Sequence, residues 1–144
     1  GLPPRGRVVR CAFPGRLFVA VVGPPMKSPR VLSNPRTLRR IVRAYEGVRD
    51  LVGALTPATF WAASERFTDR AGLAPRELRD ALRAVRRRGG RAAQAMFGRS
   101  LVATMPEDAR RAEWLKWLEE RKIRAVELGC SPRGARIVSA TPVV

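Results

Sequence analysis

Two helix starts of the same kind set the order of elements in this chain. Asn34-Pro35 and Thr56-Pro57 each place a capping side chain directly before a proline, a pair that favours the first turn of a helix. A third helix is expected from Pro75, because proline is tolerated at a helix start. Gly72 and Gly89-Gly90 are expected to end the second and third helices. Three consecutive helices are therefore predicted in the middle of the chain.

The apolar residues of these helices recur at helical spacing, so each helix is expected to turn one apolar stripe inward. The predicted inward positions are Leu38, Ile41, Val42, Tyr45, Val48 and Val52 in the first helix, Phe60, Ala63, Phe67 and Ala71 in the second, and Leu78, Leu82 and Val85 in the third. The run Arg86–Arg88 is interpreted as the solvated end of the third helix, where positive charge is favourable.

Short β-branched or apolar segments flank the helices and predict strands. Before the helices, Pro14-Gly15 separates two such segments, so two strands or one bent strand are expected. The segments are Arg7–Ala12 and Leu17–Val22 before the helices, Arg91–Phe97 and Ser100–Thr104 as a hairpin about Gly98-Arg99, and Ile123–Leu128 with Ala135–Ala140 as a closing hairpin. The prolines between Gly23 and Pro29 predict an irregular loop.

A last helix is predicted after Pro106, with Glu107 and Asp108 at its positive end. The resulting order is strand, helices, hairpin, helix and closing hairpin. This order predicts an α+β fold that is ferredoxin-like, with a mostly antiparallel sheet and helices on one face. The length of 144 residues, without a long linker, predicts one domain over residues 1–144.

The charge of the chain is strongly positive and comes almost entirely from arginine. Lysine and arginine number 29 against 12 acidic residues, which gives a formal net charge of +17. Such charge is typical of proteins that bind nucleic acids, but arginines spread over solvated surfaces give the same total. The aromatic residues mostly fall within the apolar periodicities, and no zinc-finger, RNP-type or GxxG pattern is present. A basic ferredoxin-like module that binds RNA or another polyanion is therefore kept as the alternative function.

The chain contains no histidine and only two cysteines, Cys11 and Cys130. Histidine-based catalytic triads and histidine metal sites are therefore excluded, and two thiolates are too few for a structural zinc site. Free thiols and a cytoplasmic location are expected. The first residues have no apolar core of a signal peptide, and no apolar stretch is long enough to span a membrane.

With these elements in place, the chain resembles the C-terminal domain of the GHMP-superfamily small-molecule kinases, and within them the archaeal pantoate kinase type. The resemblance covers nearly the whole chain. The segments that carry it are Gly23-Pro24-Pro25-Met26-Lys27-Ser28, Val31-Leu32-Ser33-Asn34-Pro35, the stretch from Ala92 to Ala103 that includes Ala95-Met96-Phe97-Gly98-Arg99-Ser100, and Gly134-Ala135-Arg136-Ile137-Val138. The family's third glycine motif is reduced here to Gly98.

This resemblance implies a C-terminal lobe or split subunit of a kinase that phosphorylates a small hydroxy acid such as pantoate with ATP, in coenzyme A biosynthesis. The Gly/Ser-rich phosphate loop of the family's N-terminal domain has no counterpart in the sequence, and a Walker A motif is also missing. The chain is therefore expected to be inactive alone, with ATP and Mg²⁺ bound only in the presence of an N-terminal domain. The expected partners are such an ATP-binding half or further copies of the chain, and an acidic small-molecule substrate, but no membrane.

The resemblance also implies substrate-binding residues but no catalytic ones. Lys27 and Ser28 match a loop on the substrate side, where a cation beside a hydroxyl suits a carboxylate. Gly98, Arg99 and Ser100 lie in the hairpin that faces the phosphoryl-transfer cleft in relatives. The alternatives are a plain hairpin turn with Gly98 at positive φ, and solvated side chains at Lys27 and Arg99. A regulatory or oligomerising domain without chemistry is a third possible function.

Overall fold

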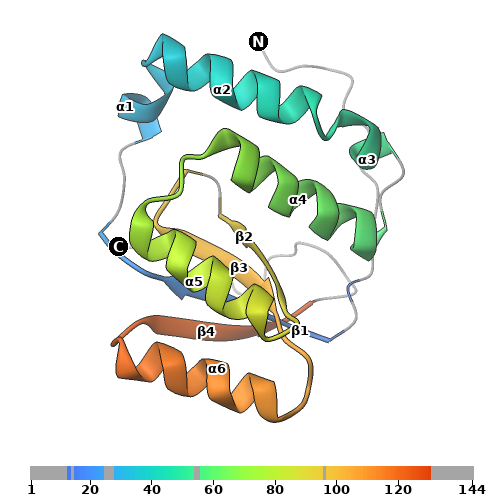
Figure 1. The fold of residues 1–144 in the computed structure, drawn as a ribbon, viewed down its shortest axis with the longest axis vertical. Coiled ribbons are helices and arrows are strands. Elements are labelled where there is room, and N and C mark those ends of the chain that lie inside the picture. Colours follow the sequence, from blue (N-terminus) through green and yellow to red (C-terminus); the bar gives the residue numbers. More distant parts are fainter. Residues whose placement is uncertain (1–12, 14, 25–27, 54–55, 96, 131–144) are drawn as a thin grey trace, which may run out of the picture.

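A four-stranded antiparallel sheet lies at the centre of the computed structural model, which describes residues 13, 15–24, 28–53, 56–95 and 97–130 (Figure 1). The strands are β1 (Arg16–Val21), β2 (Arg91–Gln94), β3 (Ser100–Thr104) and β4 (Arg124–Gly129). The helices are α1 (Ser28–Leu32), α2 (Pro35–Glu46), α3 (Arg49–Gly53), α4 (Pro57–Ala71), α5 (Arg76–Arg87) and α6 (Ala109–Glu120).

The strand order β2-β3-β1-β4 confirms the predicted fold class. Strand β1 pairs antiparallel with β3 and with β4, and β2 pairs antiparallel with β3. The helices α1 to α5 connect β1 to β2, and α6 connects β3 to β4. Each helical connection therefore joins two parallel strands that are separated by one other strand, which is the split arrangement of ferredoxin-like α+β folds.

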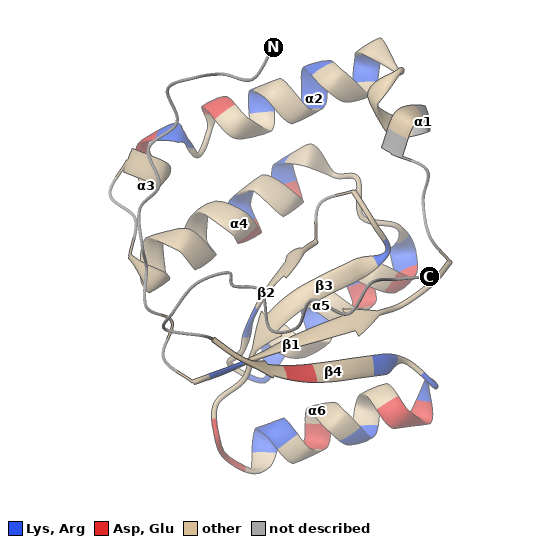
Figure 2. Cartoon of the chain, turned by 180° about the vertical axis from the view of Figure 1, so that it is seen from behind, with Lys and Arg blue, Asp and Glu red and all other residues tan. Residues whose placement is uncertain are grey.

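The helices α5 and α6 cover one face of the sheet and form the main core with it (Figure 1). Phe18 of β1 packs edge-on against Trp114 of α6, with the ring centroids 5.2 Å apart. The three positions predicted to face inward on α5 are all buried: Leu78, Leu82 and Val85. Figure 2 views the sheet from the side opposite α5. Val21 of β1 and Val126 and Leu128 of β4 are exposed, since they alternate along the strands with the residues that face the core.

Helix α4 lies along β2 and satisfies the outward N–H groups of that edge strand. The N–H of Ala92 donates to Glu65 Oε1 at 3.0 Å, and the N–H of Gln94 donates to Thr68 Oγ1 at 3.1 Å. Glu65 also accepts two hydrogen bonds from Arg91 Nε, each of 3.0 Å. Residues three apart on a helix share one face, so these two side chains of α4 match two alternate residues of β2. The edge is thereby protected from further pairing.

The arginine run at the end of α5 is engaged with its neighbours, contrary to the interpretation as a solvated helix end. Arg86 donates to both carboxylate oxygens of Asp69 at 3.0 Å and to the carbonyl of Ala92 at 2.9 Å. Arg88 donates to the carbonyl of Ala84 at 3.0 Å and lies 3.7 Å from Glu113. Only Arg87 of this run is exposed. The run therefore joins α5 to α4, β2 and α6 and is not a continuous anion-binding surface.

The predicted helix boundaries are mostly confirmed. Asn34 accepts hydrogen bonds from the N–H groups of the first turn of α2, and Thr56 forms a reciprocal capping box at the start of α4. Gly72 ends α4 in the left-handed conformation with φ +58°. The first predicted helix instead divides at Gly47, which ends α2. The predicted irregular loop is wrong at its end, because α1 begins at Ser28; Pro29 occupies the first turn, where its missing N–H costs nothing.

The apolar stripe predicted for the first helix is only partly buried. Val48 is buried, but Leu38, Val42 and Tyr45 are 41–53% exposed. The buried line is rotated by one residue and includes Ala44, at 1% exposure. An alanine at the contact lets α2 approach α4 closely, so the larger side chains remain at the side of the contact.

Some predictions fall outside the described residues, namely the strands Arg7–Ala12 and Ala135–Ala140. Cys130 is exposed, and the pairing state of Cys11 stays a prediction. No helix in the described part of the chain is long and apolar enough to cross a membrane.

Candidate functional site

The structure places the start of the loop that precedes Ser28 beside the turn that holds Gly98 and Arg99. The end of β1 lies beside the start of β3, with Val21 opposite Ser100 in the register. The N–H of Val22 donates to the carbonyl of Arg99 at 2.8 Å. The loop that leads from β1 to α1 therefore starts next to the turn between β2 and β3, which holds Gly98 and Arg99.

Arg99 crosses this junction and lies over Gly23. A Cβ atom on Gly23 would stand 2.8 Å from Arg99 Cδ and 3.2 Å from Arg99 Nη1, so only glycine leaves this space for the arginine. The two segments thus fit each other at the level of side chain and backbone. Gly23 was expected only as part of a loop motif. Its contact with Arg99 joins residues 76 positions apart, which local sequence patterns do not reveal.

The guanidinium of Arg99 has unused hydrogen-bonding capacity. Its Nε is buried and has no hydrogen-bond partner among the described residues, and no described acid forms an ion pair with it. Arg88 Nε is also buried without a hydrogen bond, but Glu113 lies 3.7 Å from it. A buried N–H donor without a partner is costly. An anion is the ligand that a half-buried guanidinium accepts best, since carboxylate and phosphate match its planar fork.

Gly98 sits in a turn that differs from the predicted two-residue hairpin. Strand β2 ends at Gln94, three residues before the expected end, and β3 begins at Ser100 as predicted. The N–H of Gly98 donates to the carbonyl of Ala95 at 3.2 Å, and this turn bends the chain before Phe97 can extend the strand. The alternative interpretation of Gly98 at positive φ is wrong, because the positive-φ glycines of the described residues are Gly15, Gly72 and Gly89.

These contacts also limit what Gly98 offers to a ligand. Its N–H and its carbonyl are both used within the turn, the carbonyl as acceptor of a 2.9 Å hydrogen bond from Gln94 Nε2. The side chain of Gln94 thus fixes the turn. The side chain of Arg99 is then the part of the turn that is best suited to bind an oxyanion.

The remaining predicted residues are placed less completely. Ser28 is the first residue of α1, and Ser100 is the first residue of β3, where it is half-buried. Lys27 lies outside the described residues. Among the residues that the structure describes, no group of three or more His, Cys, Asp and Glu side chains is arranged to hold a metal ion.

No protein-family model matches the chain, and no curated protein matches it.

Proposed function

We propose that this chain is the C-terminal lobe, or a separate subunit, of a GHMP-type kinase that phosphorylates a small hydroxy acid such as pantoate with ATP. In this proposal the chain supplies the anion-binding part of the acceptor site. It is inactive alone and acts with an N-terminal ATP-binding half. The proposal rests on the sequence resemblance, and the ferredoxin-like strand order agrees with it.

The observation that carries the proposal is the guanidinium of Arg99, which has no partner among the described residues. Its buried Nε lies where the loop that the resemblance assigns to the substrate side begins beside the hairpin that it places at the phosphoryl-transfer cleft. A carboxylate of the acceptor would pair with the half-buried guanidinium and would leave the acceptor hydroxyl to point away from the arginine. Fixing the hydroxyl relative to a bound nucleotide is the main contribution that a protein makes to phosphoryl transfer.

The chemistry divides between the two halves. The acceptor hydroxyl oxygen attacks the γ-phosphorus of ATP, ADP leaves, and the hydroxyl proton is lost to solvent or to a base of the other half. The residues of this chain hold the acid and orient it, and ATP with Mg²⁺ supplies the phosphoryl group when the N-terminal half is present.

The test is phosphoryl transfer in a mixture of this chain with the ATP-binding half of a GHMP-type kinase, followed by ³¹P NMR with pantoate as acceptor. Arg99→Met removes the guanidinium, and Gly23→Ala displaces it by filling its place. Both variants are expected to raise the KM for pantoate about tenfold or more, with a smaller change in kcat, because a binding contact is lost. Arg87→Met is the control, since Arg87 is exposed on α5. Transfer that is equally fast in Arg99→Met and wild type would refute the assignment.

A second candidate, binding of RNA or another polyanion, is favoured by the charge of α2. This helix carries four arginines and one glutamate, and Figure 2 shows basic positions recurring along it. Arg36, Arg39 and Arg43 are exposed and form no ion pair with the described acids. Affinity for an RNA oligonucleotide that falls steeply with salt, with no phosphoryl transfer in any mixture, would support this function instead.

A further inference from the structure

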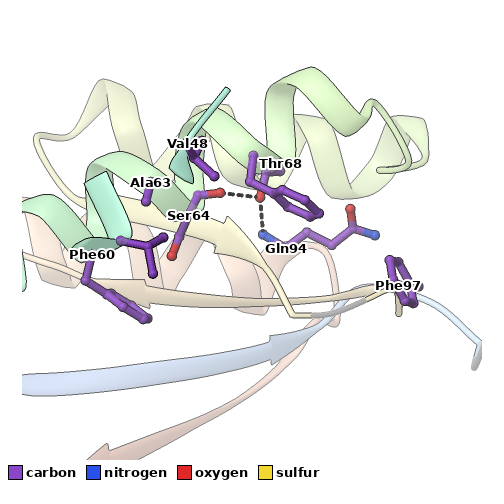
Figure 3. Close-up of a pocket in the computed structure, with 9 residues that line it drawn as sticks. Val48, Phe60, Ala63, Ser64, Thr68, Gln94 and Phe97 are labelled. Atoms are coloured by element: carbon purple, nitrogen blue, oxygen red, sulfur yellow. Dashed lines mark hydrogen bonds between the residues drawn. The ribbon is translucent and has the colours of Figure 1, made fainter. Parts of the chain in front are cut away.

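A pocket of ≈ 570 Å³ lies between α4, the segment around α3, and the end of β2 with the turn that follows it (Figure 3). Three phenylalanines line it: Phe60 and Phe67 from α4, and Phe97 from the turn. Val48 and Val52 close it from the side of α3. Its volume falls within the range of about 300–1,000 Å³ that is usual for sites of small molecules.

The described residues that line this pocket include no charged side chain. In the whole chain 28% of residues are charged, and most of these are arginine. The nine residues that line the pocket are instead apolar, or carry a hydroxyl or an amide. The uncharged walls disfavour an anion, because it would find no partner there to replace its hydration. A cation is disfavoured by the formal net charge of +17 on the chain.

Hydrogen bonds hold the walls of the pocket in place. Thr68 donates from Oγ1 to the carbonyl of Ser64 at 2.8 Å and accepts the N–H of Gln94 at 3.1 Å, as drawn in Figure 3. Gln94 Nε2 donates to the carbonyl of Gly98 at 2.9 Å. Helix α4, strand β2 and the turn are thus tied together, so the pocket exists before a ligand enters and binding need not order its walls.

Two polar atoms remain available to a ligand. The Nε2 of Gln94 is used by Gly98, which leaves Oε1 of this side chain as an acceptor without a partner among the described residues. The hydroxyl of Ser64 has no hydrogen bond with any described residue. An acceptor near an aromatic wall suits a ring that carries an N–H or O–H donor.

We propose that this pocket binds an uncharged aromatic small molecule with one hydrogen-bond donor, which packs between Phe60, Phe67 and Phe97 and donates to Gln94 Oε1. The aromatic lining offers edge and face contacts to such a ring. The ligand differs in charge from the hydroxy acid proposed for Arg99, so this site does not depend on the kinase function.

The test uses N-phenyl-1-naphthylamine, a neutral aromatic probe with a single N–H whose fluorescence rises in apolar surroundings. We expect saturable binding of one probe per chain. Ser64→Phe fills the pocket and is expected to weaken binding at least tenfold. Phe97→Ala removes a half-buried wall residue of the turn and is expected to weaken it about fivefold. Far-UV circular dichroism and thermal melts establish that each variant is folded.

The control variant tests whether the probe binds instead to the exposed apolar face of the sheet. Val126→Ala removes a side chain that is 58% exposed on β4, and it is expected to change the affinity less than twofold. Methyl resonances of Val48 and Val52 should shift when the probe binds. Absence of saturation, unchanged binding in both Ser64→Phe and Phe97→Ala, or an equal loss in Val126→Ala would overturn the proposal. Methyl shifts that depend on protein concentration without probe would also overturn it, by showing that a second copy covers the pocket.

Discussion

Replacing Glu65 by alanine should destabilise the protein far more than the loss of an ordinary surface ion pair. The Glu65 side chain is 18% exposed, accepts the N–H of Ala92, and forms a bidentate pair with Arg91. Its removal leaves one edge N–H without an acceptor, at about 1–3 kcal/mol, and loses a charge-assisted hydrogen bond of about 1.5–3 kcal/mol. Because Arg91 is 41% exposed and can regain water, we expect a total in the lower part of this sum, about 2.5–4 kcal/mol.

Urea unfolding at pH 7 measures this loss, and a constant m-value would show that the variant unfolds from the same compact state. Asp80→Ala is the matched control, since it breaks an ion pair of 2.9 Å whose side chains are 60% and 50% exposed. Its expected cost is about 0–0.5 kcal/mol. If Glu65→Ala is no more destabilising than Asp80→Ala, α4 does not secure the edge of β2, and the placement of the following turn must have another cause.

Three further predictions concern other positions. Asp108→Ala removes the cap of α6 and should lower the melting temperature by a few degrees at pH 7. The hydrogen bond from the Arg110 side chain lowers the pKa of the Asp108 carboxyl below its ordinary 3.8. The stabilisation by ionised Asp108 is therefore present above about pH 4 and is lost as the pH falls through the lowered pKa. The melting temperatures of the wild type and of Asp108→Ala should converge at that low pH. Trp114→Phe should lower the free energy of unfolding by about 1 kcal/mol or less, because the buried indole Nε1 has no hydrogen-bond partner to lose. Trp114→Ala should lower it by about 3–5 kcal/mol, because it leaves a cavity. Equal losses in urea unfolding would contradict this. Gly98→Val should change the free energy of unfolding by less than about 1 kcal/mol. The φ angle is not positive, and the tight 3.3 Å approach of the new Cβ is to Ser100 Oγ, a side-chain atom that can move. A larger loss would show that the turn requires glycine.

The parts of the fold that could be predicted from the sequence are those set by neighbouring residues. The helix ends are examples, since each depends on residues within one turn of it. They include the caps Asn34 and Thr56 and the left-handed Gly72. The order of strands and helices then led to the ferredoxin-like topology, because few arrangements connect such elements without crossing. The early end of β2 was missed because a turn bond from Gly98 to Ala95 overrides the strand tendency of the residues between.

The site was less predictable because its contacts are distant in the sequence. Arg99 was a candidate, but its contact with Gly23 appears only when β1 and β3 pair. Arg91 pairs with Glu65, and Arg86 pairs with Asp69. These two arginines therefore bind acidic side chains within the fold and do not add to a free basic surface. The face of α2 that is buried was also not predictable, because it contains the small Ala44. Periodicity alone does not favour burial of Ala44 over burial of Leu38.

The most direct test of the central claim is a ¹H–¹⁵N NMR titration of this chain with pantoate, observing the Arg99 Nε–H signal and the amides of Val22 and Gly23. Pantoyl lactone, which lacks the carboxylate, serves as the matched ligand. Pantoate is expected to shift the Arg99 signal and these amides in a saturable way, and the lactone is expected to leave them unchanged. Shifts that spread evenly over the arginines of α2, or equal effects of pantoate and its lactone, would contradict an acceptor site at Arg99.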